Sequence, residues 1–161
     1  MRNRRMTAVG LVLVLSLAAL SFKCSGNGGC NDNSPHCSSA RAADAIAKSI
    51  SEAITVKREL ARQGKITPAE ELKLTQQLLR LNTADKAFVR RIKALSAAPD
   101  AATNEQLKSL FNEVTAALDD LNTNGVLGLQ DQGARDRLTV IITAIRASAQ
   151  IIQPFLSGGG G

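Results

Sequence analysis

The chain has 161 residues, which is room for one domain of ordinary size and a short additional segment. It has no Trp, no Tyr and only four Phe, while 44% of its residues are hydrophobic, so its core must be built from Leu, Ile, Val and Ala, a composition that favours helices over a β-sandwich. The scarcity of aromatic rings also removes the stacking platforms of single-strand nucleic-acid binders, and we expect no nucleic-acid partner despite the net charge of +6.

The first 21 residues have the pattern of an export signal. Arg2, Arg4 and Arg5 precede an apolar run at 6–20, and the small residues at its end suit cleavage after Ser21. The run is shorter than a typical membrane-spanning helix, although an uncleaved anchor that includes the next two residues is an alternative. The sequence therefore predicts export to the periplasm and cell envelope or to the outside of the cell.

Residues 22–38 are rich in Cys, Gly, Asn and Ser and lack apolar periodicity, which predicts a flexible tether. Within it, Cys24 and the Ser-Gly-Asn-Gly-Gly that follows resemble the start of mature bacterial lipoproteins, a resemblance that covers only about ten residues. The resemblance implies acylation of Cys24 and attachment to a membrane.

The odd number of cysteines leaves several arrangements open. Lipidation of Cys24 would leave Cys30 and Cys37 to form a disulfide in an oxidising compartment. Cleavage after Ser21 would instead leave three thiols. A small metal or redox site would need all three cysteines together with His36, but the spacing lacks the paired C-x-x-C of most zinc sites.

Residues 39–156 predict an all-α, up-down-up-down four-helix bundle, because four amphipathic segments follow one another with short connections. The first segment is expected at 40–63, with Ser38 or Ser39 as its N-cap. Lys57 interrupts the apolar face of this segment. We expect its aliphatic stem to pack in the seam while its ammonium group reaches water.

A short turn separates the first two helices. Gly64 can adopt the left-handed conformation that closes a helix. Thr67, Pro68 and Glu70 then provide the N-cap, the first helical position and the capping box of the second helix. So short a turn requires the two helices to be antiparallel.

The second helix is expected at 68–97, before a proline. Its heptad of apolar residues is widened by Leu72, Leu79 and Val89. Asp85 falls on this seam as well.

Two interpretations of Asp85 are open. An inward carboxylate could bind an ion or relay a proton. We expect instead that the helix rotates locally, turns Ala84 inward and lets Asp85 meet Lys48 or another base, because an unpaired buried carboxylate is costly.

The third helix is expected to open with a second capping box, Thr103 and Gln106, and to stop at 122–125. Being about 18 residues long against about 30 for the second helix, it would leave an overhang that could serve as a docking ledge. The apolar residues 126–129 are expected to fold back as a lid over one end of the core.

The fourth helix is expected to begin at or near Asp131, and residues 157–161 are expected to form a Gly-rich flexible tail. Val140 and Ile151 lie off its main apolar face. They are either buried between two neighbouring helices or form a contact surface for a partner protein or for self-association.

Charge is unevenly distributed along the chain. Residues 38–97 carry twelve basic and six acidic side chains, whereas residues 98–161 carry four and seven. The basic first hairpin is either an ordinary solvated surface or an attachment to an anionic membrane surface.

The helical segments have no recognisable catalytic or cofactor-binding pattern. The only His is in the tether, and the sequence lacks Glu-x-x-His pairs, a haem-attachment motif and a Gly-rich nucleotide loop. We therefore predict a non-enzymatic binding or structural module without cofactor or metal, in the bacterial cell envelope or outside the cell. A membrane-attached, lipoprotein-like bundle is the alternative, and the metal or redox site in the tether is a weaker one.

Overall fold

The structure is a computed structural model that describes residues 35–95 and 100–157. These residues form four α-helices and one short π-helical segment, with no strand among them. The helices are α1 (Pro35–Arg62), α2 (Pro68–Lys93), α3 (Ala101–Asp120) and α4 (Gln132–Ser157), and the π-helix η1 (Leu121–Val126) follows α3 directly. The predicted all-α four-helix bundle is confirmed.

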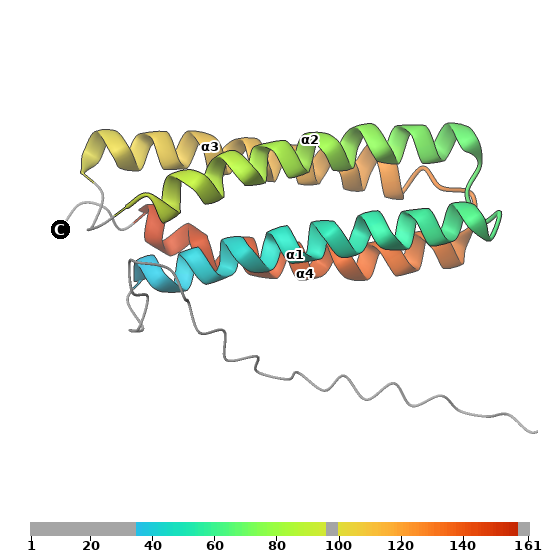
Figure 1. The fold of residues 1–161 in the computed structure, drawn as a ribbon, viewed down its shortest axis with the longest axis horizontal. Helices are drawn as coiled ribbons and strands as arrows, with labels where there is room; N and C mark the ends of the chain where they lie inside the picture. The colour runs from blue at the N-terminus through green and yellow to red at the C-terminus, as the bar shows by residue number, and fades with distance from the viewer. Residues whose placement is uncertain (1–34, 96–99, 158–161) are drawn as a thin grey trace, which may run out of the picture.

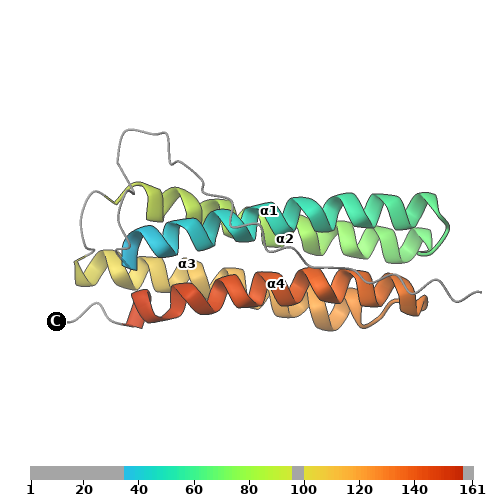
Figure 2. The same cartoon turned by 90° about the horizontal axis from the view of Figure 1, so that it is seen from below.

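The helices run alternately up and down the bundle axis. Figure 1 shows α2 beside α3 and α1 beside α4, and Figure 2, turned by 90°, shows α1 and α2 in one layer and α3 and α4 in the other. Each helix therefore occupies one corner of a square. Contacts join all four neighbouring pairs, with α3 and α4 approaching each other least. The start of α1 and the end of α4 lie at the same end of the bundle (Figure 1).

The core is the meeting point of the four predicted apolar stripes. It contains a continuous cluster of aliphatic side chains, together with a ring contact between Phe88 and Phe111 at 5.5 Å between centroids. Such burial is the main term that stabilises a bundle of this kind. The largest fully buried side chains are Phe88, Ile46, Ile50, Leu60, Leu74, Leu81, Ile92, Leu107, Leu118, Leu121, Ile142 and Ile145.

The turn between α1 and α2 has the predicted geometry. Gly64 has φ of +67°, and the amides of Gly64 and Lys65 donate to carbonyls in the last turn of α1. The Thr67 hydroxyl accepts from the Glu70 amide at 3.2 Å, while the Thr67 amide donates to Glu70 Oε2 at 2.7 Å, which completes the capping box. The hydrogen bond from the Thr67 amide is the main reason why the pKa of Glu70 is lowered.

The same turn also holds the connection between α3 and α4. Glu70 Oε1 accepts from the Gln130 amide at 2.8 Å, and Lys65 forms an ion pair with Asp131 at 3.3 Å. Asp131 also accepts from the Ala134 amide and so caps α4, as expected. Two loops far apart in sequence are thereby fastened together at one end of the bundle.

Helix α1 begins earlier than predicted. It starts at Pro35, a residue well suited to the first helical turn, so the last four residues of the expected tether belong to the bundle. Ser38 and Ser39 are therefore not N-caps. Ser39 is fully buried inside the helix, so the expected boundary at 38/39 is wrong.

Lys57 is more deeply buried than expected. The residue is only 7% exposed, and its Nζ donates to Thr75 Oγ1 at 2.7 Å and to Glu71 Oε1 at 3.3 Å on α2. The buried cation has polar partners on the neighbouring helix, which is the condition for burying a charge at acceptable cost.

Helix α3 differs from its prediction at both ends. Asp100, not Thr103, is the N-cap: its carboxylate accepts from the Thr103 amide at 2.7 Å. Gln106 instead accepts from Arg91 on α2. At the other end the chain does not stop at 122–125 but continues through η1. Together α3 and η1 match the length of α2, so the predicted overhang and its docking ledge do not exist.

The remaining boundaries differ by a few residues. Helix α2 ends at Lys93 rather than near 97, and Ser157 belongs to α4 rather than to the tail. In the loop at 126–129, Val126 and Leu129 are buried over the end of the core, as predicted for a lid, while Leu127 is exposed.

Candidate functional site

The residues singled out in the leader and tether fall on both sides of the described boundary. Ser21, Cys24 and Cys30 lie outside the described residues. His36 and Cys37 lie in the first turn of α1. The structure therefore shows the surroundings of two of the four side chains that a metal or redox site would need.

His36 joins three helices at one end of the bundle. Its Nε2 lies 3.0 Å from the carbonyl oxygen of Ile92 near the end of α2, and its ring lies 6.2 Å from the ring of Phe155 in α4. Cys37, the next residue, is buried in α1. The His36 side chain therefore contributes to packing between helices. In the part of the chain that the structure describes, no group of three or more His, Cys, Asp or Glu side chains is placed to hold a metal ion.

Asp85 is the most unusual side chain in the bundle. Its exposed fraction is 0%, and neither carboxylate oxygen has a hydrogen-bond partner among the described residues. Ala84 does turn inward as expected, but Asp85 remains inward beside it, so the predicted rotation that would bring Asp85 to a base is wrong. Burial without hydrogen-bond partners makes the neutral form of this carboxyl group more favourable than the charged form.

The surroundings of Asp85 favour the protonated form. Burial, together with the negative charge of Asp44 on α1 as the smaller cause, raises its pKa to about 7. Asp44 itself is held by Lys93, whose Nζ lies 2.7 Å from Asp44 Oδ1. Asp85 is therefore poised to gain or lose a proton near neutral pH. The signal in the sequence was its position on the apolar seam.

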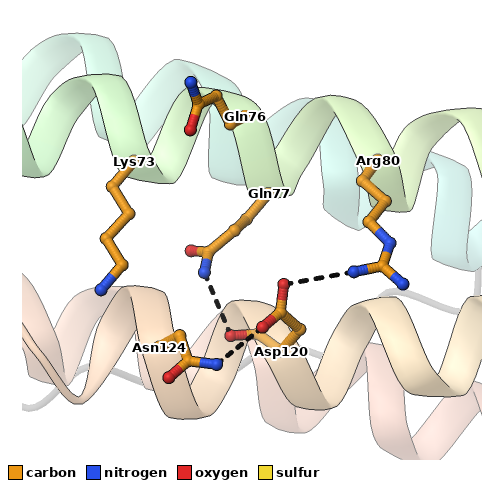
Figure 3. A pocket seen from close by; sticks show the side chains of 6 residues that line it. All are labelled: Lys73, Gln76, Gln77, Arg80, Asp120 and Asn124. Atoms are coloured by element: carbon orange, nitrogen blue, oxygen red, sulfur yellow. Dashed lines mark hydrogen bonds and ion pairs between the residues drawn. The ribbon is translucent and has the colours of Figure 1, made fainter.

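A polar hollow lies between α2 and the junction of α3 with η1 (Figure 3). Its volume is about 380 Å³. Asp120 is at its centre: the Asp120 carboxylate accepts from Asn124 Nδ2 at 2.7 Å and lies 3.6 Å from Arg80. The lining side chains are Lys73, Gln76, Gln77, Arg80, Asp120 and Asn124.

Gln77 is the buried member of this hollow. Its Nε2 donates to the carbonyl oxygen of Asp120 at 3.3 Å, while its Oε1 has no hydrogen-bond partner among the described residues. A side chain at Gly125 would collide with Gln77 Oε1, so the glycine in η1 makes room for the glutamine. The wide turn of η1 and the absent Cβ let a polar side chain enter the seam here. The sequence analysis did not identify this hollow, because no motif marks it.

Large apolar side chains are exposed on two helices. Val140 and Ile151 on α4 are 69% and 55% exposed, which excludes the burial between neighbours that was one of the two expectations. Leu72 and Leu79 on α2 are 61% and 62% exposed, so they do not widen the core stripe as predicted, whereas Val89 does pack against the core.

By length and composition alone, α4 is the one helix within 35–95 and 100–157 that could cross a membrane. A core helix of a water-soluble bundle meets the same criterion, so the finding is weak support for insertion.

No protein-family model matches the chain, and neither the curated proteins nor the solved structures include one that is significantly similar to it.

Proposed function

We propose that this protein is an exported, non-enzymatic helical bundle that acts as a binding or structural module in the bacterial cell envelope or outside the cell. The proposal rests on one observation, which is that the apolar side chains lie in two places. One set fills the core between the four helices, and a second set lies on the outer surface, where more than half of each side chain is exposed. Contiguous exposed apolar side chains on an otherwise polar surface are typical of contact sites.

Export is supported by the order of segments in the sequence. A charged start, an apolar run and small residues precede the Cys- and Gly-rich stretch and the bundle. A membrane-attached form, through acylated Cys24 or through the basic first hairpin on anionic lipid, is the alternative. It is favoured by the excess of basic residues in α1 and α2.

The localisation is tested by separating soluble and membrane fractions. The intact mass and the N-terminal sequence of the protein are then measured in each fraction. We expect the soluble envelope or extracellular fraction to contain a chain that starts after Ser21, with no lipid mass. Lipid mass on Cys24 would support the alternative, and a full-length chain in the cytoplasm would overturn export. The same spectra, taken before and after reduction, show whether Cys30 and Cys37 form a disulfide.

The outer face of α4 is the proposed contact surface. Val140 and Ile151 lie three turns apart on this face, with the small exposed residues Ala144 and Ala147 between them. The strip carries no charged side chain of its own. Its apolar surface can therefore pack against a partner protein or against a second copy of the chain.

Replacing both Val140 and Ile151 with serine is expected to weaken partner binding or self-association at least about tenfold, because two exposed apolar anchors are lost. Sedimentation across a concentration series measures self-association, and titration measures binding of an isolated partner. The double substitution Thr139→Ser with Thr143→Ser on α4 is the control and should have no effect. An unchanged association constant in the Val140 and Ile151 variant would remove this surface from the proposal.

A further inference from the structure

The outer face of α2 combines leucines with cations in one line. Leu72, Leu79 and Lys86 follow at intervals of seven residues, and Arg90 lies one turn further on. All four side chains are exposed. We use "outer face of α2" for these four residues. Neighbouring members seven residues apart are separated by about 10.5 Å along the helix.

The charged side chains of this face are all positive. Beyond the first turn of α2 the only carboxylate is Asp85, which is buried. Arg80 and Lys93 are paired with Asp120 and Asp44. By contrast, Lys86 and Arg90 form no ion pair with any residue in 35–95 or 100–157. Two unpaired cations therefore continue the line of two exposed leucines.

We infer that the outer face of α2 binds an acidic amphipathic helix of a partner protein. The inference rests on the proposed function and specifies the chemistry of one partner. A helix laid along α2 would place apolar side chains on Leu72 and Leu79 and carboxylates beside Lys86 and Arg90. Charge complementarity selects an acidic partner, and the spacing of seven residues matches the repeat of a helix packed along another helix.

A helix fits this face better than a lipid surface does. Two leucines separated by Thr75 and Gln76 offer little apolar area for insertion into a bilayer, compared with the broad apolar face of membrane-surface helices. The neighbouring helix α3 has an exposed carboxylate, Glu113, that forms no ion pair with any residue in 35–95 or 100–157, and anionic lipid would repel it. A single partner helix is narrow enough to contact α2 without contacting the carboxylates of α3.

The test uses the full chain and a labelled helical peptide of about three heptads, with leucines on one face and glutamates beside them. A peptide of the same composition in shuffled order is the control for charge alone. We expect saturable binding of the patterned peptide by fluorescence anisotropy, about tenfold tighter than binding of the shuffled one. Equal binding of the two peptides, or no binding of either, would overturn the inference.

Variants locate the binding site. Replacing Lys86 and Arg90 with glutamate should weaken binding of the patterned peptide at least about tenfold at low salt, and the loss should shrink at high salt. The matched control replaces Arg58 and Arg62, two exposed cations of α1, with glutamate and should have less than about threefold effect. Equal losses in the two variants would mean nonspecific attraction and would overturn the inference.

The leucines are tested separately. Replacing Leu72 and Leu79 with serine should weaken binding about tenfold at both low and high salt, because the lost contact is apolar. Both side chains are exposed, so the helical circular dichroism should not change. Binding of phosphatidylglycerol vesicles that depends on Lys86 and Arg90, without binding of the peptide, would overturn the inference in favour of lipid. None of these results affects the export measurement, so failure here is distinct from failure of the proposed function.

Discussion

Replacing Asp85 with asparagine is expected to raise the free energy of unfolding at about pH 8 by about 1 to 4 kcal/mol. The upper value follows from the difference between the pKa of about 7 in the folded protein and the ordinary value of 3.8, at about 1.4 kcal/mol for each unit. The lower value allows for the asparagine amide, which is buried in the same place and also needs hydrogen-bond partners. Removing a charge here should therefore stabilise the bundle.

The sign of the pH dependence follows from the raised pKa. Below about pH 4 the Asp85 carboxyl is neutral in both states and costs nothing in charge burial. Between about pH 4 and pH 7 the unfolded chain releases a proton that the folded protein keeps, so this group makes the protein less stable as the pH rises. Above about pH 7 the penalty is complete and constant.

Urea unfolding at several pH values between about 4 and 8 measures this effect. The difference between the Asp85→Asn variant and the wild type should be small at about pH 4 and largest at about pH 8. Asp136→Asn is the control, because Asp136 is an exposed carboxylate on α4, and it should change stability by less than about 0.5 kcal/mol at each pH. A variant as stable as the wild type at every pH would show that Asp85 is hydrated in solution.

Replacing Phe88 with alanine is expected to lower the free energy of unfolding by about 3 to 5 kcal/mol. Phe88 is the largest fully buried side chain, and its ring packs on that of Phe111 from the neighbouring helix. The substitution removes apolar surface from the core and leaves a cavity that the surrounding helices cannot fill without losing their own contacts.

Phe155→Ala provides the comparison. Phe155 is half-buried at the end of α4, so its loss should cost less than about 2 kcal/mol by urea unfolding. Equal losses at the two positions would contradict the arrangement of the core, because they would mean that the centre of the bundle packs no better than its end.

The two expectations concern the same part of the bundle. Asp85 and Phe88 lie three residues apart on the buried side of α2. The apolar packing through which Phe88 stabilises the bundle also keeps water from the Asp85 carboxylate. A stable core and a poised carboxyl group are therefore consequences of one arrangement.

Local interactions were readable from the sequence. The left-handed Gly64 and the capping box of Thr67 and Glu70 involve neighbours within a few residues, so the pattern of residue types was sufficient to predict them. The number of helices and their antiparallel order followed from periodicity and short connections. Of the candidate sites, Asp85 was marked by its position on the apolar seam, but the expected rotation of its side chain toward a base was wrong.

Helix ends were less predictable. The composition before residue 39 indicated a tether, yet α1 begins at Pro35 because His36 packs against Ile92 and Phe155 from two other helices. Likewise, Asn and Gly residues indicated a stop where η1 continues, since Gly125 gives room to Gln77 from α2. These contacts join residues far apart in the chain, and no local pattern records them.

The sequence by itself determined the four amphipathic helices, the turn that makes the first pair antiparallel and the angular spacing of apolar residues on each helix. Only the tertiary structure decided which part of each apolar face is buried: Asp85 points inward, while Leu72 and Leu79 face solvent. Periodicity specifies angles between side chains on one helix but not the rotation of that helix toward its neighbours. The rotation of each helix is set by the total apolar surface that all four helices bury together. The best total can place one carboxyl group inside the core and leave two leucines in solvent.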